Sequence, residues 1–195
     1  MDVLPRAPLG RSLSLRGIGA IGVKSNPGLA TRRTSERHNC RKEHGLDSLC
    51  LGCQIVRGER LPPGGTIIET EHFHAHQDIA VPVPGLVITA ARRHVRCLDE
   101  FTDEETKELL PLLAAIRRAQ RSVLGIEHVY YFYNEDTPAH FHIWMVPRHD
   151  WMRQFGHSIE SVRPAFLHAR ANMSNPEGWA EVEHSARLLR EQLRR

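Results

Sequence analysis

Hydrophobic positions alternate with polar ones in several short runs along the last three quarters of the chain, and Pro and Gly punctuate them. A period of two is typical of strands that bury one face. The pattern predicts strands over residues 66–78, 86–90, 127–134 and 140–147. Only a short polar stretch separates the last two runs, so they are expected to pair as a hairpin.

Two further segments have helical spacing. Thr102 and Glu105 form a possible capping box, and the apolar stripe that follows predicts a helix over residues 103–124. A second helix is expected to start at Asn175 and Pro176, with one apolar stripe along it. Strands, helix, hairpin and helix in that order predict an α+β fold with an antiparallel sheet. Both stripes are candidate dimer surfaces and equally ordinary core faces.

The length and composition indicate one soluble domain with extensions. The chain has 195 residues, of which 41% are hydrophobic and 25% charged. Residues 1–45 show no sustained period and are predicted to be a disordered or targeting extension. The domain is expected over residues 46–150, with residues 151–195 as a C-terminal loop and helix that pack on it. No run of about 18 apolar residues occurs, so a membrane-spanning helix is not expected.

The distribution of charge argues against nucleic acid as a partner. Residues 1–45 carry nine Lys or Arg and three acids, a net charge of +6, which leaves −3 for the rest. A nonspecific nucleic-acid binder would carry its basic excess on the folded domain. No stable nucleic-acid binding is therefore predicted.

The same N-terminal stretch bears on the compartment. Its Arg- and Ser-rich, acid-poor composition fits an organellar transit peptide, and also an extension upstream of the true start. Four cysteines without a framework spacing give no sign of an oxidising compartment. The cytoplasm is the expected location, with an organelle as the alternative.

Two histidine clusters are candidates for the reactive site. The first is His72, His74 and His76, flanked by acids and amides, and we interpret it as exposed imidazoles on a polar strand face. The second contains His140 and His142 on a strand whose opposite face is strongly apolar. Such a strand would hold its polar side chains rigidly, which favours the second cluster as the reactive one.

Five collinear segments between Cys50 and Arg148 resemble the histidine triad superfamily of nucleotide hydrolases and transferases. They are Cys50–Gly58 with Glu59, Gln77 to Ile79, Pro84 to Ile88, His94 with Val95, and Asn134 followed by the run His140 to Arg148. The resemblance implies an α+β fold with a long helix between the strands and a C-terminal helix.

The resemblance also implies roles for individual residues. His142 matches the nucleophile that attacks the α-phosphorus of a nucleotide, and His140 matches the histidine that helps to position it. A neutral imidazole nitrogen suits this covalent route. Asp78 resembles the acid that binds ribose hydroxyls, Ile79 would contact the base, and Asn134 would contact the nucleotide. The alternatives are an ordinary surface aspartate and a strand-ending asparagine.

Trp144 stands where the superfamily usually has its third histidine. It would still border the substrate, but an indole has one donor and no acid function at neutral pH. Loss of a general acid or base typically costs about 10² to 10⁴-fold. Altered substrate range or slower hydrolysis is therefore expected.

Cys50 and Cys53 have the spacing that lets two thiolates hold one zinc ion. In a subset of the superfamily such a pair is completed by histidines that match His94 and His140. The resemblance thus implies a structural zinc site of four ligands. Two buried thiols or a redox pair remain the alternatives from the spacing alone.

The resemblance implies a hydrolase or nucleotidyl transferase that acts at the α-phosphate of a dinucleoside polyphosphate, such as diadenosine polyphosphate, or a nucleoside phosphoramidate, through a nucleotidyl-histidine. The resemblance implies a homodimer. The alternatives are a nucleotide-binding or sensing module with impaired catalysis, and a zinc-stabilised interaction domain.

Overall fold

The structure is a computed structural model that describes residues 50–135 and 140–195. Its centre is one five-stranded antiparallel sheet in the order β1-β2-β3-β5-β4. The strands are β1 (Thr66–Glu69), β2 (Phe73–Gln77), β3 (Val87–Ala91), β4 (Val129–Phe132) and β5 (His142–Pro147). The predicted α+β class is confirmed.

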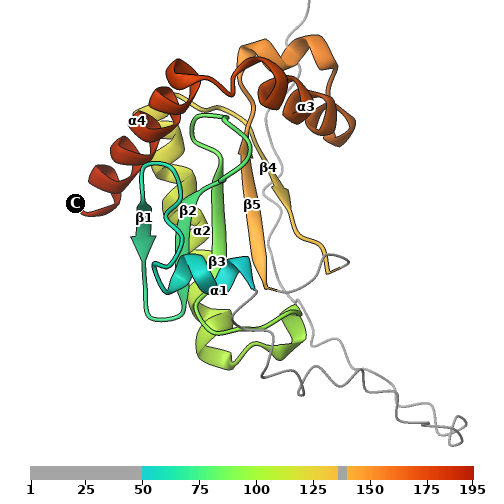
Figure 1. The fold of residues 1–195 in the computed structure, drawn as a ribbon. Coiled ribbons are helices and arrows are strands. Elements are labelled where there is room, and N and C mark those ends of the chain that lie inside the picture. The colour runs from blue at the N-terminus through green and yellow to red at the C-terminus, as the bar shows by residue number, and fades with distance from the viewer. Residues whose placement is uncertain (1–49, 136–139) are drawn as a thin grey trace, which may run out of the picture. The chain divides into compact units, whose positions relative to one another are not determined.

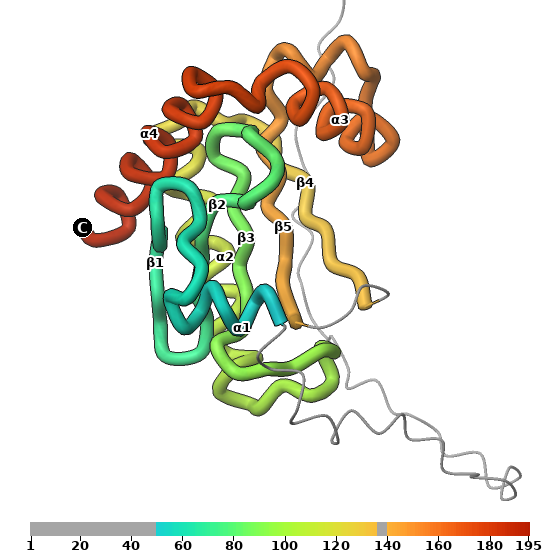
Figure 2. The backbone as a smooth tube through the Cα atoms, in the orientation of Figure 1, coloured from blue at the N-terminus to red at the C-terminus, as the bar shows by residue number. Residues whose placement is uncertain are grey.

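The helices account for most of the remaining described chain. They are α1 (Leu51–Val56), α2 (Asp103–Leu124), α3 (Val162–Asn172) and α4 (Pro176–Leu193), with short 3-10 turns η1 (Leu98–Glu100), η2 (Asp150–Phe155) and η3 (Ile159–Ser161). Figure 1 shows α2 behind the sheet and α1 crossing in front of it, and the tube in Figure 2 follows the same path. None of the described helices is long and apolar enough to cross a membrane.

The two long helices form as their sequences predict. In α2, the Thr102 hydroxyl accepts the N–H of Glu105, whose carboxylate accepts the N–H of Thr102, so a full capping box starts the helix. Pro111 lies inside α2 without ending it. In α4, Asn175 caps the start and accepts the N–H of Gly178.

One face of the sheet packs against α2 and α4 and forms the main core. The apolar side of β5 enters this core, with Phe141 just before the strand and Met145 on it almost fully buried. Val182, Ala186 and Leu189 of α4 are also completely buried. From its sequence alone, the apolar stripe of α4 fits either a dimer surface or a core face. The structure supports the core face.

The region between β5 and α4, whose sequence shows no clear pattern, folds into η2, η3 and α3. A second apolar cluster joins this region to the loop after β2 and to Val146 of β5. Ala165 and Ala169 of α3 are buried in it. The segment thus places α3 near the end of β5 and the start of β4 (Figure 1).

The predicted strand over residues 66–78 is wrong in one respect, because it is two antiparallel strands joined by a turn. Thr70 lies in this turn, and its N–H donates to the carbonyl of Phe73 at 2.9 Å. β1 and β2 therefore form a hairpin, and Asp78 follows the end of β2.

Candidate functional site

The strand registers bring the polar side chains of β2 and β5 onto one face of the sheet. Directly paired residues on neighbouring strands point to the same face. His74 pairs with Ala90, which pairs with His142, and in the next row His76 pairs with Ile88, which pairs with Trp144. This face, opposite the core of α2 and α4, is called the reaction face below.

His142 is the half-buried imidazole at the start of β5. Its Nδ1 lies 2.8 Å from the backbone carbonyl of His140. A carbonyl can only accept a hydrogen bond, so Nδ1 carries the proton and Nε2 carries the lone pair. The backbone therefore fixes both the tautomer and the orientation of the ring, which are the requirements for a nucleophilic nitrogen.

His140 precedes the strand, and its ring turns toward the start of α1. Its Nε2 lies 2.5 Å from the carbonyl of Ala91, so Nε2 donates and Nδ1 has the lone pair. Nδ1 lies 3.5 Å from the sulfurs of both Cys50 and Cys53. His140 thus uses its backbone to support His142 and its ring to join the cysteines.

His94 completes this cluster, since its Nδ1 lies 3.2 Å from Sγ of Cys53. The four ligand atoms of Cys50, Cys53, His94 and His140 all lie within 4.8 Å of one another, and both cysteines are buried. Two thiolates and two imidazoles are a donor set typical of tetrahedral structural zinc. The hydrogen bond from His140 to a carbonyl is the outer support that metal-bound histidines usually have. The residues therefore fit zinc.

Gly52 lets α1 approach this cluster closely. A Cβ at this position would lie 2.5 Å from Cγ of His140, which is too close for any side chain. The spacing of the two cysteines pointed to zinc, but the role of the residue between them becomes visible only in three dimensions.

Asp78 is buried directly after β2. Its Oδ1 accepts the N–H groups of Ala80 and Val81 at 2.8 and 2.7 Å, which closes a turn. Burial raises the pKa of Asp78 above its usual value, while these N–H groups, Arg170 and His142 oppose the rise. Within residues 50–135 and 140–195 no hydrogen bond reaches Oδ2, which leaves this oxygen for a ligand.

The first histidine cluster differs from its predicted state. His72 lies in the turn before β2, whereas His74 and His76 are on β2 and only 3% and 5% exposed. The prediction of exposed imidazoles is therefore wrong for these two. Their polar neighbours in sequence suggested a solvated edge, but β2 lies between β1 and β3, and burial depends on that pairing.

Trp144 is half-buried on the reaction face next to His142, with ring centres 6.1 Å apart. On its other side it stacks on Phe166 of α3, with centres 5.6 Å apart and planes at 28°. The side of His142 that faces α3 is therefore aromatic. Sequence patterns gave no sign of Phe166, because the segment before α4 has no clear periodicity.

Ile79 and Asn134 are the other residues predicted to contact the substrate. Ile79 is half-buried beside Asp78, and Asn134 is exposed after β4. The residues that link Asn134 to His140 fall at 136–139, outside the described part of the chain. Asp78 thus lies directly after β2, and His142 and Trp144 lie on β5, while the contact of Asn134 with a nucleotide stays a prediction.

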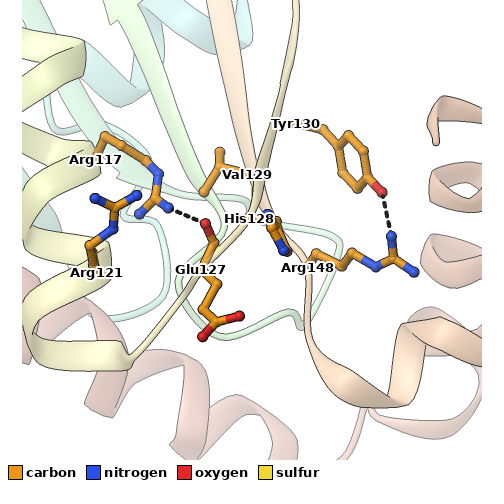
Figure 3. Close-up of a pocket in the computed structure, with 7 residues that line it drawn as sticks. All are labelled: Arg117, Arg121, Glu127, His128, Val129, Tyr130 and Arg148. Carbon is orange, nitrogen blue, oxygen red and sulfur yellow. Dashed lines mark hydrogen bonds between the residues drawn. The ribbon is translucent and has the colours of Figure 1, made fainter. Parts of the chain in front are cut away.

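A basic hollow of about 450 Å³ lies at the edge of the sheet that β4 forms (Figure 3). Asp78, His142 and Trp144 do not line it. Arg117 and Arg121 of α2 border it, and Arg117 donates to the carbonyl of Glu127. Arg148 also lines it, and donates to the Tyr130 hydroxyl and the carbonyl of Gly156. Arg148 therefore holds β4 and the chain after η2 together.

Comparisons with known proteins agree with this geometry. No family model matches the chain. The chain is 28% identical to the protein hit of Bacillus subtilis over 112 residues, which cover 55% of this chain and 76% of the relative. The structure of a zinc-bound histidine triad family protein from Mycobacterium smegmatis matches with a TM-score of 0.55 and 25% identity, over 76% of this chain and 95% of that one.

A hypothetical histidine triad nucleotide-binding protein from Sulfolobus tokodaii has the same fold, with a TM-score of 0.55, 16% identity, and 74% and 92% of the two chains covered. A Hit-like protein from Bartonella henselae matches with a TM-score of 0.52 and 15% identity, over 73% and 95%. The fold of this chain is thus that of these histidine triad structures.

Proposed function

We propose that this protein is a histidine triad hydrolase or nucleotidyl transferase in which Nε2 of His142 attacks the α-phosphorus of a nucleotide. The observation that carries the proposal is the 2.8 Å hydrogen bond between Nδ1 of His142 and the carbonyl of His140. This bond places the proton on Nδ1, so Nε2 carries a lone pair and is held by a strand of the sheet. The solved structures with this fold include a zinc-bound histidine triad protein and a hypothetical histidine triad nucleotide-binding protein, which supports a nucleotide as substrate.

The reaction would occur in two displacements. In the first, the lone pair of Nε2 forms a bond to the α-phosphorus, and the bond from phosphorus to the leaving oxygen or nitrogen breaks. The leaving group takes that electron pair and a proton from solvent. In the second, water attacks the same phosphorus and gives a proton to solvent, while the N–P bond breaks and its electron pair returns to Nε2. A nucleoside monophosphate leaves, and His142 regains its neutral ring.

Residues of the reaction face would bind the nucleotide during both steps. The free Oδ2 of Asp78 would accept hydrogen bonds from ribose hydroxyls, for which a carboxylate is well suited. Trp144 would border the leaving group, and Ile79 the base. We place a zinc ion on Cys50, Cys53, His94 and His140, where it would stabilise the fold and fix the carbonyl that orients His142.

The substrates proposed are dinucleoside polyphosphates and nucleoside phosphoramidates, in which the α-phosphate is joined to the leaving group by an anhydride bond or an amidate bond respectively. The test follows release of AMP from diadenosine polyphosphate and from an adenosine phosphoramidate by the full chain. The His142→Ala variant is expected to lose release, whereas His184→Ala, an exposed histidine of α4, is expected to keep it. Mass mapping after rapid quenching should find the nucleotidyl group on His142. Equal release by His142→Ala would overturn the proposal.

A second candidate is a nucleotide sensor without turnover, which the missing third histidine at Trp144 favours. A sensor would bind the nucleotide with the affinity expected of the site, yet release no AMP and form no phosphorus-linked histidine. Calorimetric titration beside the quench experiment separates the two functions.

A further inference from the structure

His76 shares the reaction face with His142 and Trp144, although the proposed mechanism gives it no role. His76 pairs with Ile88 of β3, which pairs in turn with Trp144 of β5, so one residue lies between His76 and Trp144 across the sheet. Neighbouring strands are about 4.8 Å apart, so His76 lies roughly 10 Å across the sheet from β5, which is the scale of a nucleoside. The small or apolar side chains of Ile88 and Ala90 lie between the two ends as a floor.

The tautomer of His76 is fixed by its own strand. Nδ1 lies 2.7 Å from the carbonyl of Gln77, so Nδ1 donates and Nε2 has the lone pair. Within residues 50–135 and 140–195, Nε2 makes no hydrogen bond, yet it is not among the completely buried atoms without a partner. Burial lowers the pKa of His76 to about 4, so the ring is neutral at physiological pH. It can accept a hydrogen bond but cannot supply a proton.

His74 shows what a merely structural histidine looks like on the same strand. Its Nε2 lies 2.9 Å from the hydroxyl of Thr66, a contact within the β1–β2 hairpin. Its Nδ1 also has no hydrogen-bond partner among the described residues, but this atom is completely buried and out of reach of a ligand. Unlike His74, whose Nε2 contacts Thr66, His76 thus has on the reaction face an accepting nitrogen that is not completely buried.

We propose that Nε2 of His76 accepts a hydrogen bond from the nucleotide bound on the reaction face, and so selects nucleotides that offer a donor at that point. The inference rests on the proposed function. The donor is either an amino group of the base or a hydroxyl of the ribose, which are the N–H and O–H groups of a nucleoside. In either case the imidazole determines specificity and takes no part in the displacement.

The experiment measures binding, so that it does not depend on turnover. In a His142→Ala background, the dissociation constant of AMP is compared with those of purine riboside monophosphate, which lacks the amino group, and of 2′-deoxy- and 3′-deoxy-AMP. One of these analogues is expected to bind about tenfold more weakly than AMP, as one hydrogen bond implies. The identity of that analogue assigns the donor.

The His76→Phe variant keeps an aromatic ring but has no acceptor. In it, AMP and the discriminated analogue are expected to bind equally. The matched control His74→Phe, on the same strand, is expected to keep the discrimination. If His76→Phe folds and still discriminates as its parent does, the role of His76 is overturned while the proposed function stands. If the chain binds none of the nucleotides, the proposed function fails, and the role of His76 fails with it.

Discussion

Sγ of Cys53 lies 3.2 Å from Nδ1 of His94, although 41 residues separate them in the chain. Together with Cys50 and His140, this pair links α1, the segment after β3, and the start of β5. A metal that joins three segments stabilises the folded chain, because the unfolded chain holds no formed site. Zinc would therefore stabilise the part of the fold that orients His142.

The first prediction is that the purified chain contains about one zinc ion, the content of one tetrahedral site. Cys53→Ser should lose it, and the melting temperature should fall, since folding and metal binding are coupled. Cys97→Ser serves as the control because Cys97 lies outside the cluster. The measurement is metal analysis beside thermal unfolding with and without a chelator. Unchanged metal content in Cys53→Ser would remove the zinc site.

The second prediction concerns the close packing of α1 on His140. Gly52→Ala adds a methyl group where the Cγ atom of His140 is only 2.5 Å away, so the ring must move from the cysteines. We expect zinc affinity to fall by about 10 to 100-fold, as for disturbed support of a metal ligand. Competition with a zinc chelator measures it. Leu51→Ala, on an exposed side chain of the same helix, should bind zinc as the natural chain does.

The third prediction is that the ionised carboxylate of Asp78 destabilises the fold at neutral pH, although it binds the nucleotide. Burial raises the pKa of Asp78, so the folded chain binds its proton more tightly than the unfolded chain, and the ionised carboxylate destabilises the fold at neutral pH. Asp78→Asn keeps an oxygen for the N–H groups of Ala80 and Val81 and should raise the melting temperature at neutral pH. This gain should vanish as the pH falls through the pKa of Asp78.

The same substitution should weaken nucleotide binding. Hydrogen bonds to a charged group contribute about 1.5 to 3 kcal/mol, so affinity for AMP should fall about 10 to 100-fold. Calorimetry at neutral pH and thermal unfolding across the acidic range measure both effects. If Asp78→Asn is less stable and binds AMP normally, Asp78 is a turn residue alone.

Much of the fold could be predicted because local sequence and tertiary packing agree. The capping box at Thr102 and the glycine at 125, which adopts a positive φ at the helix end, mark both ends of α2. The alternation around His142 identified the buried and the open faces of β5. These signals act within a few residues and need no knowledge of the partner strands.

The site could be predicted only in part, because its remaining features depend on contacts between distant segments. His74 and His76 were expected to be exposed from their neighbours in sequence, but pairing of β2 with β1 and β3 buries them. The stacking of Trp144 on Phe166 depends on the position of α3, and no periodic pattern in that segment indicates it. Burial of polar side chains is decided by strand order, which a local pattern does not contain.

The fourth prediction concerns Trp144, which stacks on Phe166 and which we propose stands in the place of a third histidine. Trp144→His restores an imidazole beside the leaving group, and departure should speed up toward the lower end of the about 10² to 10⁴-fold that general acids supply. Trp144→Phe keeps a ring but loses the indole donor, and should slow departure about tenfold. Rapid-quench measurement of the first displacement tests both. A slower Trp144→His at unchanged stability would show that the aromatic surface itself binds the leaving group.

The fifth prediction follows from the buried ring of His76. Its pKa is about 4 in the folded chain and near the ordinary value of 6.5 when unfolded, chiefly because burial disfavours the charged form. Between pH 6.5 and 4 the unfolded chain therefore binds a proton that the folded chain does not, and stability falls as the pH falls. The loss from this residue would reach about 3 kcal/mol at the acidic end of the window.

His76→Phe should remove that part of the pH dependence and leave stability above pH 6.5 nearly unchanged. The nearby His74, His140 and His142 also disfavour protonation of His76. Their own titration persists in the variant, so the comparison is the difference between the two chains at each pH. Denaturant unfolding from pH 7.5 to 4.5 measures it. Parallel curves for the two chains would mean that His76 is solvated in solution, and its accepting nitrogen would then already be occupied by water.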